Sequence, residues 1–199
     1  MKKSIYLFLV FFSTVVEIFS QTNLQIPLAV KVPVIDGKVT TNEWNDAIVA
    51  KIILDGNEVV EVSIKRDNEA LYFLYKGSLG NKFLFPEVCF DVNNNGSSKW
   101  EEDDLWFHVS ATDCFSKGKY SGYENCKLVQ PDWQGVPNFE QGKPGPNEIE
   151  IKIHYTLATA KTEMGICFIV TNTFNSWKTW PQHADRNNPS TWGKLILIK

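Results

Sequence analysis

The segment NEIEIKIHY, residues 147–155, decides the fold class of this chain. Its three isoleucines, at positions 149, 151 and 153, alternate with charged and polar residues. Because successive side chains of a β-strand point to opposite faces of the sheet, a period of two gives the strand one apolar and one polar face. The segment is therefore predicted to be a half-buried strand of an antiparallel sheet.

Other strand-like runs, rich in β-branched and aromatic residues, lie at 58–66, 70–77, 87–92, 104–111, 164–174 and 194–199. A helical signal is confined to one or two turns at 40–47, where Thr40 and Glu43 have capping-box spacing. Residues 130–147 are rich in proline and glycine, so we expect a long surface loop there, and a second irregular stretch at 177–192. The predicted fold is an all-β antiparallel β-sandwich.

The first residues have the composition of an export signal. Two lysines precede an apolar run over residues 5–16, which is too short to span a membrane and fits a secretory signal. We expect residues 1–20 to be a signal peptide and residues 21–199 to form one domain. No cysteine near Ser20 could accept a lipid, so the expected location is secreted or periplasmic, without a membrane span.

The charge of the chain is weak. The formal net charge is -3, and removal of two lysines and one glutamate with residues 1–20 leaves -4. This charge argues against nucleic acid or an anionic membrane surface as a partner.

Four cysteines form an even set, which in an exported chain favours disulfides over metal ligation or thiol catalysis. Three pairings are possible. A bond between Cys114 and Cys126 would close a short loop and stabilise the fold by roughly 3 kcal/mol. We predict this pair, with Cys89–Cys167 joining two neighbouring strands; two buried free thiols are the alternative for the second pair.

A cation site is predicted in FDVNNNGSSKWEEDD, residues 90–104. Counting from Asp91 as position 1, asparagines fill positions 3 and 5, Gly96 fills position 6 and Glu102 fills position 12, as in the EF-hand calcium loop. A site with so few carboxylates implies weak affinity, on the order of 10⁻⁴ to 10⁻³ M. The alternative is an Asn-Gly turn followed by a solvated acidic stretch. The predicted calcium (Ca2+) ligands are Asp91, Asn93, Asn95, Ser97, Glu102 and Asp104, with Asp103 as an additional or replacement ligand.

Sugar rings stack on flat aromatic side chains, and their hydroxyls bond to amide, carboxylate and guanidinium groups, so tryptophans beside amides in loops are candidates. Trp44 and Trp192 are expected in the core, whereas Trp100 and Trp106 could face either way. The predicted ligand-binding residues are Trp133, Trp177, Trp180, Arg186 and Asn188.

Three segments together resemble the family 9 carbohydrate-binding modules and their DOMON-like relatives. They are VPVIDGKVTTNEWNDA at 32–47, CFDVNNNGSSKWEEDDLWFHVS at 89–110 and NNPSTWGKLILIK at 187–199. The resemblance implies a jelly-roll-like sandwich with bound calcium. Sugar-binding members clamp a pyranose between two aromatics, whose positions fall here near Asn81 and Arg186, so a binding face would be built from other residues.

The sequence carries none of the hydrolase or phosphate-binding motifs, and its three histidines are far apart, so we expect no enzyme. The predicted function is a secreted, calcium-stabilised carbohydrate-binding module. It would capture a polysaccharide or glycan, with secreted glycoside hydrolases or cell-surface proteins as partners in carbohydrate catabolism. One alternative is a structural or adhesion domain that binds proteins. Another is a haem-binding DOMON domain that uses Met164 with His108, His154 or His183.

Overall fold

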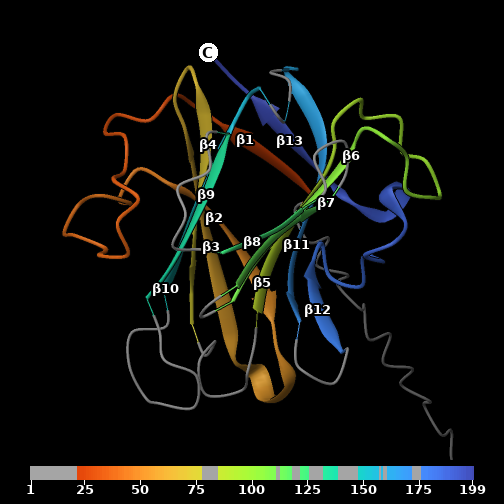
Figure 1. Ribbon diagram of the computed structural model, residues 1–199, viewed down its shortest axis with the longest axis horizontal. Helices are drawn as coiled ribbons and strands as arrows, with labels where there is room; N and C mark the ends of the chain where they lie inside the picture. Colours follow the sequence, from red (N-terminus) through yellow and green to blue (C-terminus); the bar gives the residue numbers. More distant parts are fainter. Residues whose placement is uncertain are drawn as a thin grey trace, which may run out of the picture.

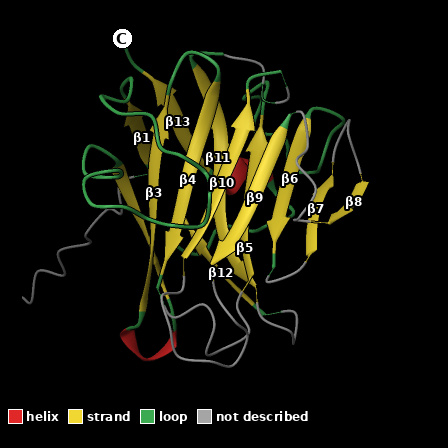
Figure 2. Cartoon of the chain, turned by 60° about the vertical axis from the view of Figure 1, so that its left-hand side comes forward, coloured by secondary structure: helices red, strands yellow, loops and turns green. Residues whose placement is uncertain are grey.

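The protein is described by a computed structural model over residues 22–77, 85–110, 113–117, 122–125, 132–138, 148–156, 158, 161–171 and 176–199. Two β-sheets lie face to face in it (Figures 1 and 2). Within these residues, the elements are strands apart from two short 3-10 helices, η1 (Asp55–Asn57) and η3 (Pro189–Thr191). The predicted all-β sandwich is confirmed.

The larger sheet has eight strands in the order β1-β13-β11-β5-β6-β7-β8, with β12 also paired to β11. All its pairs are antiparallel except β1 with β13. Its strands are β1 (Asn23–Ile26), β5 (Phe85–Asp91), β6 (Asp104–Val109), β7 (Asp113–Lys117), β8 (Gly122–Asn125), β11 (Glu163–Thr171), β12 (Trp177–Trp180) and β13 (Gly193–Leu197).

The smaller sheet has five antiparallel strands in the order β2-β3-β4-β10-β9. Its strands are β2 (Ile48–Ile53), β3 (Val59–Arg66), β4 (Ala70–Lys76), β9 (Trp133–Asn138) and β10 (Glu148–His154).

The main core lies between the sheets and is rich in aromatic rings. Phe73 of the smaller sheet has its ring centroid 5.8 Å from that of Phe168 and 6.1 Å from that of Phe90, both on the larger sheet. All three side chains are fully buried. These three side chains lie on the inner faces of the sheets. Because side chains alternate along a strand, the residues next to them in sequence point to the outer faces.

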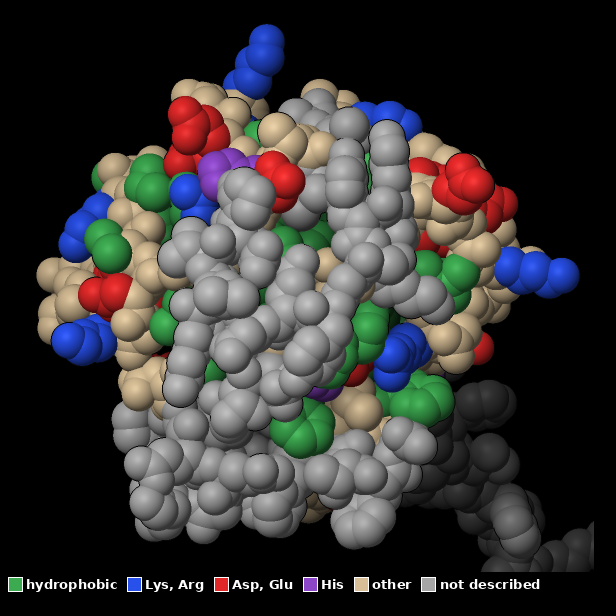
Figure 3. Space-filling model, viewed as in Figure 1, with side chains coloured by type: hydrophobic (Ala, Val, Ile, Leu, Met, Phe, Trp, Pro, Cys, Tyr) green, Lys and Arg blue, Asp and Glu red, His purple; other side chains and the backbone are tan. Residues whose placement is uncertain are grey.

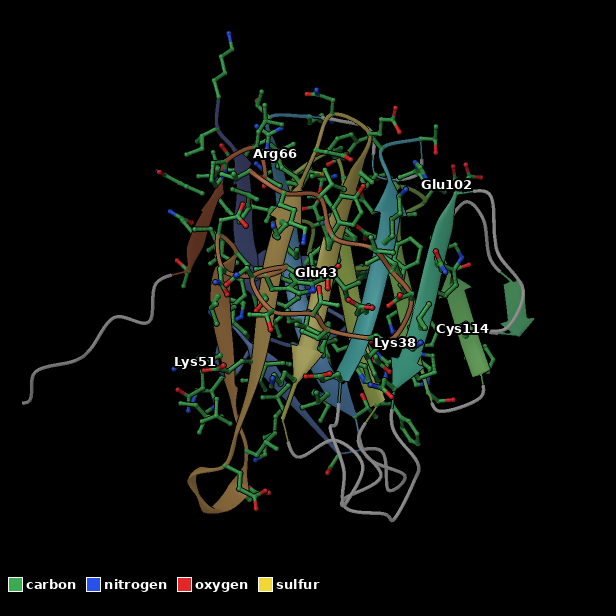
Figure 4. All side chains as sticks on the ribbon, turned by 90° about the vertical axis from the view of Figure 1, so that its left-hand side faces the viewer. Lys38, Glu43, Lys51, Arg66, Glu102 and Cys114 are labelled. Atoms are coloured by element: carbon green, nitrogen blue, oxygen red, sulfur yellow. The ribbon has the colours of Figure 1, made fainter. Side chains whose placement is uncertain are left out.

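Part of the outer face of β10 is buried, at Glu148 and Glu150, which corrects the prediction of a half-buried strand there, whereas Lys152 and His154 are partly exposed. The isoleucines are fully buried as expected, but Glu150 is also fully buried because the segment at 27–47 crosses this face (Figure 4). Glu150 accepts hydrogen bonds from the backbone N–H groups of Asp36 and Gly37 and from Nε1 of Trp44. Burial raises the pKa of Glu150, against the opposing effect of these bonds.

The predicted helical turn is absent, although its capping contact forms. Residues 41–46 are turns and bends, while Glu43 Oε2 accepts both the N–H and the hydroxyl of Thr40, at 2.9 and 3.0 Å. Trp44 folds back under this turn and is 9% exposed, and Trp192 is 8% exposed, so both are core residues as predicted.

The prediction of a loop over 130–147 is wrong for β9. Proline is tolerated there because β9 is an edge strand, where one side of the backbone makes no ladder bonds. Gly135 is needed because a Cβ at this position would lie 2.5 Å from Val109 Cγ2. Gly135, which indicated a loop, instead leaves room for the side chains of Val109 and Cys114 from the larger sheet.

The predicted Cys89–Cys167 disulfide is also wrong. The two residues are directly opposite on β5 and β11, but both are buried free thiols, and burial raises the pKa of each. They pack as small apolar side chains with Ala184 and Trp192, a common role for buried cysteine. Cys126, the predicted partner of Cys114, lies outside the described residues, so that pairing stays a prediction.

Basic side chains are scattered over the described part of the face shown in Figure 3, in line with the weak net charge. In the described part of the chain, no helix is long and apolar enough to cross a membrane. The expected signal peptide at residues 1–20 lies outside the described residues.

Candidate functional site

Strand register brings polar side chains into rows on the outer face of the larger sheet. Glu87 of β5 lies opposite His108 of β6 on one side and Ile169 of β11 on the other. One row further along, Phe85 lies opposite Thr171. Since their neighbours in sequence, such as Val88, Phe107 and Phe168, fill the main core, these residues face away from it.

Glu87 is almost fully buried on this face, at 1% exposure. Its Oε1 lies 2.9 Å from Nδ1 of His108. Its Oε2 lies 3.6 Å from Nε of Arg186, within ion-pair distance but without a hydrogen bond. The guanidinium of Arg186 also lies 4.9 Å from the ring centroid of Trp106, which is a cation–π contact.

Three buried polar atoms of this face make no hydrogen bond. Within the described residues four such side-chain atoms exist, and Oε2 of Glu87, Nε1 of Trp106 and Oγ1 of Thr171 are three of them. A buried polar atom without a partner costs about 1 to 3 kcal/mol and is uncommon in folded proteins. A bound molecule could supply the missing partner only where the side chains that cover the atom move aside.

Aromatic rings cluster around His108, the partner of Glu87. The ring centroid of His108 lies 5.5 Å from those of Phe85 and Phe115 and 5.6 Å from that of Trp106. All four residues are partly exposed. The face therefore combines partly exposed rings with one acceptor, one donor and one hydroxyl, whose polar atoms are themselves buried. We call Glu87, Trp106, His108, Thr171 and Arg186 the outer-face site.

Of the predicted ligand-binding residues, Arg186 belongs to this site and Trp177 lies at its margin. Trp177 pairs with Thr171 across β12 and β11 and is 40% exposed. Asn188 has a structural role, since its Oδ1 accepts the N–H and hydroxyl of Ser190 at the start of η3.

Trp133 and Trp180 lie in the main core, so the structure does not support them as sugar platforms. Trp133 is 4% exposed, with its ring centroid 5.2 Å from that of Phe107. Trp180 is 5% exposed, and its ring centroid lies 5.5 Å from that of Phe168. Both loop assignments failed because the tryptophans sit in short strands whose inner face closes the sandwich.

Sequence reasoning missed Glu87 and Thr171 as site residues, left Trp106 without an assigned face, and considered His108 only as a haem ligand. The period of two within β5 and β6 could have placed Glu87 and His108 on the outer face. The alignment of Thr171 with them depends on the register between β5 and β11, which the sequence alone does not reveal.

The acidic loop places three carboxylates together. Side-chain oxygens of Asp91, Asp103 and Asp104 lie within 4.8 Å of one another, and Asp91 is opposite Asp104 in the sheet. Burial raises the pKa of Asp104 to about 6, and the neighbouring carboxylates of Asp103 and Asp91 add to this shift. A cation among these groups would offset their repulsion.

The other predicted calcium ligands form a hydrogen-bonded turn. Asp91 accepts the backbone N–H groups of Asn95 and Gly96, and Asn93 Oδ1 also accepts that of Asn95. Asn95 Oδ1 accepts the N–H of Ser97. Glu102 is exposed at the edge of the molecule and lies outside the carboxylate group (Figure 4). The structure thus combines a polar turn with a compact acidic cluster, instead of the full EF-hand arrangement.

The structure does not support the haem alternative. Met164 is fully buried in the main core, whereas His108 points to the outer face of the larger sheet. A methionine in this position acts as a packing residue.

Comparisons with known proteins identify the fold. No protein-family model and no curated protein matches the chain. Among solved structures, the chain is similar to a family 9 carbohydrate-binding module from Caldicellulosiruptor kristjanssonii in complexes with glucose and with cellotriose. Both have a TM-score of 0.60 and 18% identity, and the match covers 88% of this chain and 95% and 93% of theirs. The resemblance predicted from the sequence is confirmed at the level of the fold.

Proposed function

We propose that this protein is a carbohydrate-binding module whose ligand lies on the outer-face site. The observation that carries the proposal is the group of three unbonded polar atoms beside accessible aromatic rings. It is supported by the similar solved structures, which hold glucose and cellotriose.

Each group of the site suits one part of a sugar. Oε2 of Glu87 can accept a hydroxyl hydrogen, and such bonds to a charged acceptor are the stronger kind. Nε1 of Trp106 can donate to a hydroxyl oxygen, and Oγ1 of Thr171 can do either. The rings of Phe85, Trp106 and Phe115 offer flat apolar surface for the C–H face of the sugar.

The same chemistry argues for binding without catalysis. Glycosidases generally use two carboxyl groups that flank the scissile bond. The outer-face site has a single carboxylate, Glu87, whose oxygens face His108 and Arg186. We therefore propose a binding module that is not an enzyme, exported by the signal at residues 1–20 and acting beside secreted glycoside hydrolases or cell-surface proteins.

A broad glycan array, probed with the mature chain in calcium and again in EDTA, tests the function. We expect neutral glycans to be retained. An empty array from protein shown to be folded would contradict the proposal and favour the protein-binding alternative.

We also propose that Asp91, Asp103 and Asp104 hold a structural calcium ion. Calcium at about ten times a millimolar Kd should stabilise the protein by about 1.4 kcal/mol, which raises Tm by about 3 to 5 °C. Thermal unfolding in calcium, in magnesium and in EDTA measures this effect. Asp104→Asn should be more stable than the wild type in EDTA, because a buried charge is removed, and should gain little from calcium.

The exposed Glu69→Gln serves as the matched control and should respond to calcium like the wild type. An undiminished calcium response in Asp104→Asn would contradict the proposed ligand set.

Trp133→Phe should leave glycan affinity within about twofold of the wild type, because distant core and surface sites are usually independent. Its ring packs on Phe107 inside the core and does not reach the outer face. Titration calorimetry with a glycan from the array measures the effect. A tenfold loss of affinity in a folded variant would return Trp133 to the binding site.

A further inference from the structure

A hollow of about 540 Å³, away from the outer-face site, lies at the edge of the sandwich. Its walls are β12, the turn at 182–185, and the end of β2 with η1. This volume is within the range of small-molecule sites. We call it the β12 cleft.

The β12 cleft has an aromatic side chain at its mouth. Trp177 lines it and is 40% exposed, which is high for so large an apolar side chain. Ile53, on the opposite wall, is 48% exposed. Exposed aromatic surface beside polar groups is a feature of sites that bind amphipathic rings.

Polar groups of both signs complete the walls. Nζ of Lys178 lies 2.7 Å from Oδ1 of Asp55, so an ion pair connects β12 to η1. Gln182, His183 and Asp185 add exposed donors and acceptors on the turn. Because the lysine charge is matched within the cleft, the lining suits a neutral hydroxylated ring better than an anion.

The turn that carries these groups is held in place. His183 has φ +68°, a left-handed conformation that is uncommon for residues other than glycine and is often found at functional sites. Ala184 is buried beneath it, and its carbonyl accepts the hydroxyl of Thr179 at 3.2 Å. The side chains of Gln182 and His183 are therefore presented from a fixed backbone.

The same segment separates this cleft from the outer-face site. Asp185 lines the β12 cleft, whereas the next residue, Arg186, reaches over Trp106. Ala184, which precedes both and also lines the cleft, packs in the cluster that contains Ile169 and the buried cysteines. Two binding surfaces thus flank one short stretch of chain.

We propose that the β12 cleft is a second sugar subsite, with Trp177 as the stacking platform and Gln182, His183 and Asp185 as hydroxyl partners. The class of ligand rests on the proposed function, but binding here does not require Glu87. A module with two subsites would hold a polysaccharide at two points and gain avidity from both.

Indole N–H signals in NMR spectra of the ¹⁵N-labelled protein test the two subsites separately. The probes are cellotriose, xylotriose and mannotriose, and the signals of Trp106 and Trp177 are assigned with Phe variants. In Glu87→Gln, we expect a trisaccharide to shift the Trp177 signal while the Trp106 response is lost. Gln182→Ala combined with His183→Gly should weaken the Trp177 response about tenfold and leave that of Trp106 unchanged.

Glycine at position 183 keeps the left-handed backbone available, and Gln25→Ala, at an exposed position on β1, is the matched control. A response of Trp106 without one of Trp177 would overturn the second subsite and leave the proposed function standing. A response of Trp177 alone would support the subsite and contradict the outer-face site. Silence of both with all three sugars would overturn both.

Discussion

Glu87→Gln is expected to weaken glycan binding by about 30- to 100-fold, a loss of about 2 to 3 kcal/mol. The substitution keeps the shape of the side chain but removes the charge of a buried acceptor whose Oε2 has no hydrogen-bond partner within the protein. Titration calorimetry of both proteins with a glycan retained on the array measures the difference.

The matched control is Glu61→Gln on β3, where the glutamate is exposed and paired with Lys51 at 3.2 Å. Its affinity for the glycan should equal that of the wild type. Wild-type affinity in a folded Glu87→Gln protein would remove Glu87 from the site.

Lys65→Ala is expected to lower the free energy of unfolding by about 3 to 5 kcal/mol, the usual cost of breaking a buried ion pair from one side. The side chain of Lys65 is 1% exposed, and its Nζ donates to Oδ1 of Asp46 at 2.5 Å and to the backbone carbonyls of Glu43 and Lys31. Burial opposes ionisation of Asp46, but the hydrogen bond from Lys65 contributes to a lowered pKa. These bonds fasten the segment at 27–47 to the smaller sheet.

Urea denaturation measures this loss. Lys51→Ala is the matched control, because its side chain is 61% exposed and its ion pair with Glu61 should contribute less than about 1 kcal/mol. If both variants lost the same stability, Lys65 would not anchor the segment.

The fold was readable from the sequence because its main signals are local. Alternating isoleucines identified β10, and short β-branched runs identified half of the other strands in the described part of the chain. Local sequence patterns gave the wrong prediction where tertiary contacts determine the structure. Gly135 and Pro137 resembled loop residues but belong to an edge strand, and Glu150 has a charged side chain that only the covering segment at 27–47 explains.

The candidate site was harder to predict because its residues lie on different strands, and only the register between these strands brings them together. Glu87, His108 and Thr171 come from three strands and become neighbours only through the alignment of β5 with β6 and β11. Arg186 was predicted as a polar residue in a loop beside tryptophans, but its contact with Trp106 was not predicted. Cys89 and Cys167 show the same limit, since their adjacency was predicted correctly and their bond was not.

The most direct test of the central claim is to map backbone amide shifts by NMR during titration with the strongest glycan from the array. Binding at the outer-face site should move the amides of residues 85–89, 104–108 and 167–171, on three adjacent strands of the larger sheet. Shifts confined to the smaller sheet, or no shifts with any glycan, would contradict the account.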